Sequence, residues 1–297
     1  MITAARFVNA NGQTCNFNDN ELPFNSFTTS VDWRFTERDK AMQHGIWQGP
    51  SYLGKRLFTV EGELLESSAG AYWVKRQQFI SSILPRPHLG YQTVGTLYLT
   101  FDGINEELSC QCTLDGWPEM PLQALYPSSS KYQINWKAFD PRLYGTLQSS
   151  NATPYITALG GRVYDNGGAI RTYANGTRNY DTTVSYAIFT PITITNSGNA
   201  ETYPVVTFYG PSFNPTLSNG TQTLSLVGLT LAAGEYVVVD MAARTAIKNS
   251  NTNVYNTAVG SVWWALESGN NSILYTDGSG YTSTGLAVIT WRNAYMI

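Results

Sequence analysis

The chain has 297 residues, of which 42% are apolar, 13% aromatic and 13% charged, and its net charge at pH 7 is −3. Charged residues usually make up about a quarter of a globular protein, so this composition excludes an acidic disordered tail and a helical bundle, and it favours β-structure. The small negative charge disfavours nucleic acid as a partner, and the sequence has neither an apolar run of about 18 residues for a membrane span nor the pattern of a signal peptide. We therefore expect a soluble protein that is not exported.

Charge divides the chain into two parts. Residues 1–150 hold 26 of the Lys, Arg, Asp and Glu side chains, and residues 151–297 hold 13. The second part is instead rich in Thr, Asn, Ser and Gly between short apolar runs, which is typical of antiparallel sheets with polar, uncharged outer faces. We predict a first domain over 1–150, a linker or arm over 151–184 and a second domain over 185–297.

The first domain is predicted to contain short strands, including 2–8 and 56–65, and one helix over 69–84. Ser67 or Ser68 can cap this helix, and Pro85 and Pro87 end it because proline cannot continue the backbone hydrogen bonds. At 100° per residue one face of the helix carries an apolar stripe, which we expect to be buried. The stripe consists of Tyr72, Trp73, Phe79, Ile80, Ile83 and Leu84.

Arg76 lies inside this apolar stripe. An arginine in that place has three options: its stem lies over the core with the charge in water, it pairs with a carboxylate, or it reaches across a subunit interface. The sequence leaves all three open.

The three cysteines point to packing rather than chemistry. Cys15, Cys110 and Cys112 are an odd number, so a disulfide framework is not expected and a reducing compartment fits better. Together with His44 and His88 they match no common zinc spacing, so we predict no metal site. Cys110 and Cys112 would face the same side of a strand as small buried side chains.

The second domain is predicted to be an antiparallel β-sandwich. About seven short β-branched and aromatic runs alternate with turn sequences every 8 to 14 residues, which is the pattern of such a fold. The first two runs are joined around Asn196–Asn199, which predicts a β-hairpin with Gly198 supplying the special backbone dihedral.

No catalytic motif is recognisable. Gly278, Ser279 and Gly280 do not form the G-x-S-x-G nucleophile elbow, and the sequence has no P-loop, dinucleotide fingerprint, H-E-x-x-H or calcium loop. We therefore expect that the protein is not an enzyme and that it holds no cofactor.

Several stretches carry a resemblance to a known family. In chain order they are HGIWQGPSYLGKRLFTVEGELL, FISSILP, WKAFDPRLYG, ITITNSGNAETYPVVTFYGPSFNPTL, LTLAAGEYVVVDMAARTAI, WWALESGNNSILY and AVITWRNAYM. The combination of G-N-A-x-x-Y-P, G-P-x-x-x-P and W-R-N-A-Y is distinctive. Over nearly its whole length, apart from 147–183, the chain resembles the distal tail protein family of long-tailed bacteriophages.

The resemblance implies a mostly β fold. The N-terminal domain would be a β-barrel-like or split-barrel domain with one helix that assembles into a hexameric ring, and the C-terminal domain a galectin-like β-sandwich. The implied function is a structural adaptor that joins the distal end of the tail tube to the tail-tip hub or baseplate. On this basis Lys55, Arg56 and Arg76 are candidate subunit-interface residues.

The implied partners are those of a tail tip. They are further copies of the chain in a homo-hexamer, the major tail tube protein, the tail-tip hub protein, the tape measure protein and a receptor-binding fibre or host glycan. DNA would pass only in transit through the channel, and no membrane insertion is expected. The implied location is the distal end of the virion tail, after assembly in the host cytoplasm.

The alternative function is a carbohydrate-binding module in the C-terminal sandwich. Aromatic rings can stack on the faces of pyranose sugars, and Trp263 and Trp264 are the candidate residues. If both lie on a strand, they point to opposite faces, so that one is buried and the other is the better candidate.

Overall fold

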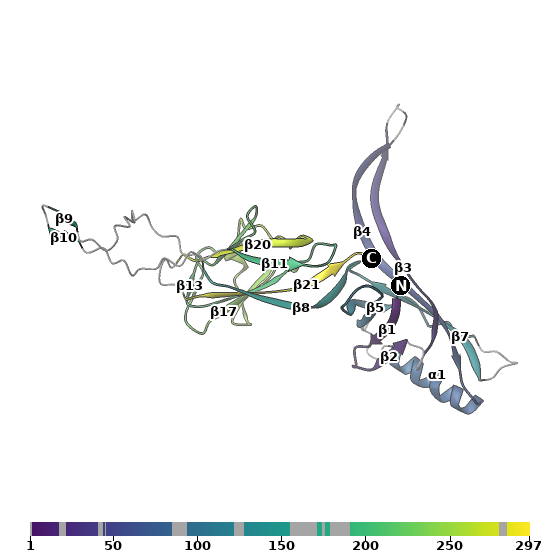
Figure 1. Ribbon diagram of the computed structural model, residues 1–297. Helices are drawn as coiled ribbons and strands as arrows, with labels where there is room; N and C mark the ends of the chain where they lie inside the picture. Colours follow the sequence, from purple (N-terminus) through teal and green to yellow (C-terminus); the bar gives the residue numbers. More distant parts are fainter. Residues whose placement is uncertain are drawn as a thin grey trace. The chain divides into compact units, whose positions relative to one another are not determined.

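The computed structural model describes residues 2–17, 22–40, 44, 46–84, 94–121, 128–154, 171–173, 176–178, 191–278 and 284–297 (Figure 1). Contacts between residues divide the chain into two units. Unit 1 consists of Met1–Thr146 and Ala294–Ile297, and unit 2 consists of Leu147–Asn293. The predicted boundaries near 150 and 185 stay predictions, but the last four residues return to unit 1, which the sequence does not indicate.

Unit 1 is built from an antiparallel sheet and one helix. Its elements are β1 (Ile2–Val8), β2 (Thr14–Phe17), β3 (Phe24–Asp39), β4 (Ile46–Leu65), α1 (Ala69–Ile83), β5 (Gly95–Phe101), β6 (Leu108–Leu114) and β7 (Ser129–Ala138). Backbone pairing gives the order β2-β1-β5-β6-β7-β4-β3. Strand β8 (Leu143–Ala152) begins in unit 1 and strand β21 (Leu286–Tyr295) ends in it, so each runs through both units.

The sheet of unit 1 curves around an aromatic core. Phe7 of β1 and Phe17 of β2 each lie with their ring centroids 5.6 Å from that of Trp136 of β7, although β2 and β7 are far apart in the strand order. Phe17 also contacts Phe79 of α1 and Tyr132 of β7. One enclosed core thus brings together both ends of the strand order and the helix, in agreement with the barrel-like fold expected for this domain.

Helix α1 begins and ends as the sequence predicts. Of the two candidate caps, Ser68 is the one used, because its hydroxyl accepts a hydrogen bond from the backbone N–H of Ala71 at 3.2 Å. Tyr72, Phe79 and Ile83 are buried. Trp73 is 46% exposed, so its predicted burial is wrong. Its position one residue after Tyr72 turns it about 100° around the helix axis, toward the edge of the stripe.

The cysteines are packing residues, as predicted. Cys110 and Cys112 lie on β6 and Cys15 on β2, and all three are buried. A hydrogen bond with the Cys110 thiol, together with burial, raises the pKa of the Cys112 thiol well above its usual range, so the thiol stays protonated at neutral pH. A protonated buried thiol is a poor nucleophile and a poor metal ligand.

Unit 2 contains two main antiparallel sheets. The first has the order β11 (Ile192–Asn196), β20 (Gly269–Thr276), β14 (Thr216–Ser218) and β15 (Thr223–Ser225). The second has the order β19 (Thr252–Asn253), β18 (Thr245–Lys248), β17 (Tyr236–Asp240), β12 (Val205–Tyr209) and β21. A short pair, β13 (Ser212–Phe213) and β16 (Thr230–Leu231), and the 3-10 helix η2 (Tyr255–Ala258) complete the unit.

The two sheets of unit 2 share one hydrophobic core. Alternate residues of β12, β17 and β21 are buried, as are those of β11, β14 and β20, so each sheet turns one face inward. Across the core, the rings of Phe208 and Tyr275 lie 5.5 Å apart. The predicted fold class, mostly β with an antiparallel sandwich in the second half, is confirmed.

The predicted hairpin around Asn196–Asn199 is wrong. Strand β11 pairs with β20, whereas β12 pairs with β17 and β21, so this turn carries the chain from one sheet to the other. Gly198 is not among the residues with positive φ. The turn is instead held by Asn196, whose side chain accepts from Gly198 N–H and donates to the Ala200 carbonyl.

Segment 151–184, which the sequence predicts to be a linker or an arm and which is distinct from the hairpin described below, lies largely outside the described residues. Within it the structure describes the end of β8 and the antiparallel pair β9 (Arg171–Tyr173) and β10 (Gly176–Arg178).

The cap of α1 gives a direct test of this fold. Ser68→Ala removes the hydroxyl that accepts from Ala71 N–H, and we expect it to lower the free energy of unfolding of unit 1 by about 1 kcal/mol. Urea unfolding followed by circular dichroism measures the change. Ser67→Ala is the matched control and should leave the midpoint unchanged; an equal loss in both variants would contradict the assignment of the cap.

Candidate functional site

The most distinctive surface of unit 1 is a long β-hairpin. Strand β4 pairs with β7 over Arg56–Leu65, but over its first part, 46–55, its described partner is β3 alone. We call the two-stranded part, residues 32–39 and 46–55, the arm. At about 3.4 Å per residue it reaches about 25 Å beyond the rest of the sheet, and Figure 1 shows β3 and β4 continuing past the other strands of unit 1.

One face of the arm is apolar. Trp33 lies opposite Leu53 and Phe35 lies opposite Ser51, and because alternate residues share a face, Trp33, Phe35 and Leu53 form one cluster. Trp33 is 61% exposed, Phe35 55% and Leu53 38%. On the other face Arg34 lies opposite Tyr52. The arm is therefore amphipathic, and its apolar side faces solvent.

The apolar face of the arm continues the core-facing side of the sheet. Nearer the core, the residues of β3 on this face lie opposite Val60 and Phe58, both fully buried. A register shift between Val31 and Trp33 gives β4 one extra residue, so that Leu53 lies on the same face as Arg56. Past Arg56 the side chains of this face are exposed. The sequence carried a signal for this, since Asp32-Trp33-Arg34-Phe35 alternates polar and apolar residues, but the strand predicted in this part of the chain covered 56–65 alone.

Arg56 is not available as an interface residue, contrary to the sequence prediction. Its side chain is 1% exposed, and its guanidinium donates to the backbone oxygen of Ile297 at 3.0 Å and to the Met296 sulfur at 3.6 Å. Burial lowers the pKa of Arg56 from its usual value. The side chain points inward because Arg56 shares the face of β4 that carries Phe58, and it holds the last residues of the chain in unit 1.

Arg76 and Lys55 have different surroundings. Arg76 donates to the Tyr72 hydroxyl at 3.1 Å and to the Met120 carbonyl at 3.0 Å. Its guanidinium thus bonds uncharged groups of unit 1, which is neither the predicted pairing with a carboxylate nor the predicted exposure of the charge to water. Lys55 is partly exposed at the base of the arm. A role of either residue at a subunit interface stays a prediction.

The two candidate sugar-binding tryptophans of unit 2 separate as the sequence predicts. Trp264 is 1% exposed and belongs to the core, so it offers no ring face to a ligand and drops out as a candidate. Trp263 is only partly buried, and its ring stacks on that of Tyr255 with a centroid distance of 5.9 Å. Sequence reasoning missed Tyr255, because the two residues are brought together by the tertiary structure.

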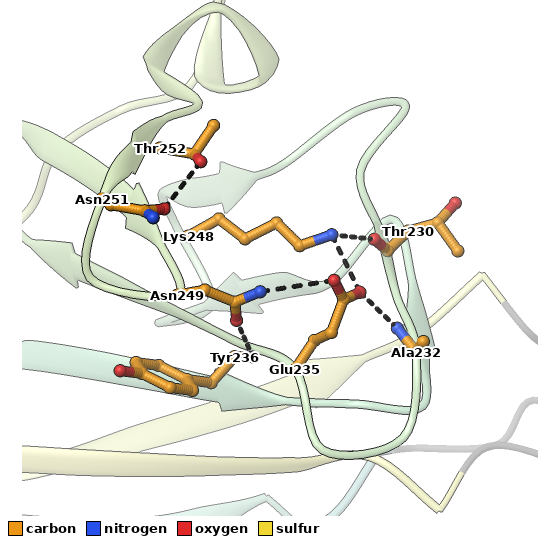
Figure 2. Close-up of polar contacts among 8 residues, drawn as sticks. All are labelled: Thr230, Ala232, Glu235, Tyr236, Lys248, Asn249, Asn251 and Thr252. Atoms are coloured by element: carbon orange, nitrogen blue, oxygen red, sulfur yellow. Dashed lines mark hydrogen bonds and ion pairs between the residues drawn. The ribbon is translucent and has the colours of Figure 1, made fainter.

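The polar cluster around Glu235 is a turn network (Figure 2). The Glu235 carboxylate accepts from Ala232 N–H, from Lys248 at 2.8 Å and from the Asn249 amide. Asn249 in turn accepts from Tyr236 N–H, and the hydrogen bond from Lys248 holds the pKa of Glu235 below its usual range. These groups are used to fix two neighbouring turns, which leaves none of them poised for proton transfer.

The described residues contain no group of three or more His, Cys, Asp and Glu side chains placed to share a metal ion. Among the described helices, none has the length and apolar character needed to cross a membrane.

Comparison with known families gives a match in unit 2. Residues 197–295 match the model of the family described as siphovirus-type tail component, C-terminal domain. This part of unit 2 is thus similar to a phage tail-component domain. The resemblance to distal tail proteins is thereby confirmed, and the match supports a structural role in a phage tail. No curated protein matches the chain significantly.

Solved structures extend the likeness to both units. The Dit protein of phage SPP1, described as a paradigm of the hub adsorption apparatus in phages that infect Gram-positive bacteria, is 11% identical, with 98% of each chain covered and a TM-score of 0.63. At this identity the match shows a shared fold. A chain of the phage P2 baseplate in its activated conformation with Ca is also 11% identical over 98% of each chain, but its TM-score of 0.46 does not establish a shared fold.

The contacts of Arg76 distinguish a structural role from an interface role. Arg76→Leu removes the donors to the Tyr72 hydroxyl and the buried Met120 carbonyl, so we expect the free energy of unfolding to fall by about 1–2 kcal/mol with the oligomeric state unchanged. Urea unfolding and light scattering measure the two quantities. A loss of assembly at unchanged stability would instead assign Arg76 to an interface. Gln77→Leu is the control, because Gln77 lies on the same helix and its side chain is exposed.

Proposed function

We propose that the protein is the ring-forming adaptor of a phage tail, a homo-hexamer that joins the distal end of the tail tube to the tail-tip hub. The observation that carries the proposal is the apolar face of the arm. The match of residues 197–295 supports the tail setting, and the fold likeness to the SPP1 Dit protein extends over both units.

The apolar face of the arm is not packed against any other described part of unit 1. An isolated two-stranded hairpin is only marginally stable in water, and Trp33, Phe35 and Leu53 would expose a contiguous apolar cluster. A neighbouring copy of the chain is the partner that a ring provides. Each subunit would place its arm on a different surface of the next, and such head-to-tail contacts close into a ring when the rotation between subunits allows it.

The remaining partners follow from the same position in the virion. One side of the ring would bind the major tail tube protein and the other the tail-tip hub protein, with the tape measure protein and DNA in transit through the channel. Unit 2 would carry peripheral adhesion components such as a receptor-binding fibre. The protein would act at the distal end of the tail after assembly in the host cytoplasm, without a catalytic step.

The apolar face of the arm provides the test. Purified full-length protein, examined by light scattering and negative-stain microscopy, should form six-fold rings, alone or with the tube protein. The double variant Trp33→Ser/Phe35→Ser should abolish rings and change the free energy of unfolding by less than about 0.5 kcal/mol, because both side chains are exposed in the subunit.

Trp117→Ser is the matched control, since Trp117 is a highly exposed tryptophan of unit 1 outside the arm. This variant should still form rings. A wild-type chain that stays monomeric under all conditions, including with the tube protein, would refute the ring proposal. Rings that persist in the double variant would refute the role of the arm.

A further inference from the structure

A second unusual surface lies in unit 2, beside η2. The rings of Tyr255 and Trp263 stack with an angle of 4° between their planes, and Tyr255 is 47% exposed. Trp263 also packs partly against the core of unit 2. The inner ring is thus anchored, and the outer ring is presented to solvent in a fixed orientation.

The backbone beneath the rings is tied down. Val227 N–H donates to the Thr257 carbonyl at 2.8 Å, and Val262 N–H donates to the Thr223 carbonyl at 3.0 Å. The Asn253 side chain accepts from Tyr255 N–H at 2.9 Å and so fixes the turn that leads into η2. These bonds hold the segment of η2 beside strand β15. A ligand that binds the rings therefore meets a surface that is already ordered, which lowers the entropic cost of binding.

The groups around the rings are uncharged and include both polar side chains and the exposed Val227, Val259 and Val262. The Tyr255 hydroxyl, the Trp263 indole N–H and the Asn256 amide form no hydrogen bond with a described residue, and Tyr255 and Asn256 are exposed. The sequence contains no Lys, Arg, Asp or Glu over 249–266 or over 221–234. Strand β18 also contacts η2 and carries Lys248, whose ammonium group is paired with Glu235 at 2.8 Å. The surface thus combines flat apolar faces with neutral donors and acceptors.

We propose that the Tyr255–Trp263 surface binds a neutral polysaccharide built of pyranose rings. The C–H face of a pyranose is apolar and flat enough to pack on an aromatic ring, while its hydroxyls can bond the free Tyr255, Trp263 and Asn256 groups. An acidic sugar, a phosphate or nucleic acid would find no cation over these two segments. A protein partner is the competing outcome of the test, because protein interfaces are also enriched in Tyr and Trp.

This proposal goes beyond the ring adaptor and rests on unit 2 alone. The ring can form without sugar binding, and sugar binding does not require the ring. The two proposals therefore fail separately.

The test uses full-length protein and three neutral probes: cellohexaose, β-1,4-galactan and mannan. Calorimetry and tryptophan fluorescence should show binding of at least one, with a dissociation constant on the order of 0.1–1 mM, and no binding of polygalacturonic acid as the charged control. Tyr255→Ala should weaken binding about tenfold or more, and Tyr255→Phe should keep most of it, since the ring face remains.

Tyr209→Ala is the matched control. Tyr209 is 41% exposed in the same unit and also lies beside a second ring, that of Tyr236, but the two planes are tilted by 40°. This variant should bind as the wild type does. Failure of all three neutral probes to bind, or equal loss in Tyr209→Ala and Tyr255→Ala, would overturn the proposal. So would capture of a tail fibre protein that depends on Tyr255 in the absence of any sugar binding.

Discussion

A β-sheet must cover its apolar face, and the two units of the protein meet this constraint in different ways. Unit 1 curves its sheet so that Phe7, Phe17 and Trp136 meet under α1. Unit 2 places two sheets face to face, with Phe208 and Tyr275 in contact across the core. The arm has neither solution, because β3 and β4 run past the helix and past the other strands of unit 1. The proposed function of the protein rests on this uncovered apolar face.

Charged groups are used mainly to hold the fold. Arg56 is buried against the last two residues of the chain, Arg76 ties α1 to the Met120 carbonyl, and Glu235 joins two turns of unit 2. A charged side chain already satisfied within the subunit has little left to offer a partner, and removing it costs stability first. The two surfaces proposed here for partners are both aromatic, one on the arm and one beside η2. The low charge and the high aromatic content of the sequence are consistent with these two aromatic surfaces.

The two aromatic surfaces differ in what they can bind. On the arm, Trp33, Phe35 and Leu53 lie in a row along a twisted ribbon, which suits an extended apolar partner such as the next subunit. Beside η2, a single stacked pair is framed by neutral polar groups, which suits a small flat ligand. Both depend on pairs of residues far apart in the chain, Trp33 with Leu53 and Tyr255 with Trp263.

Local sequence alone determined the β-rich composition, the helix over 69–84 with its serine cap, and the alternating strands of the second half. These features depend on side-chain periodicity and capping, which act over a few residues. The split of Trp263 and Trp264 into a partly exposed and a buried residue was equally local.

Only the tertiary structure decided that Arg56 points inward, that the turn at Asn196 changes sheets, and that Trp73 lies at the edge of the buried stripe. It also showed that β3 extends beyond its core and that Tyr255 completes the ring pair. Each of these depends on which distant segment packs alongside, and no local pattern carries that information. The sequence could therefore indicate that aromatic residues were abundant, but only the packing of the chain decided which of them were left for a partner.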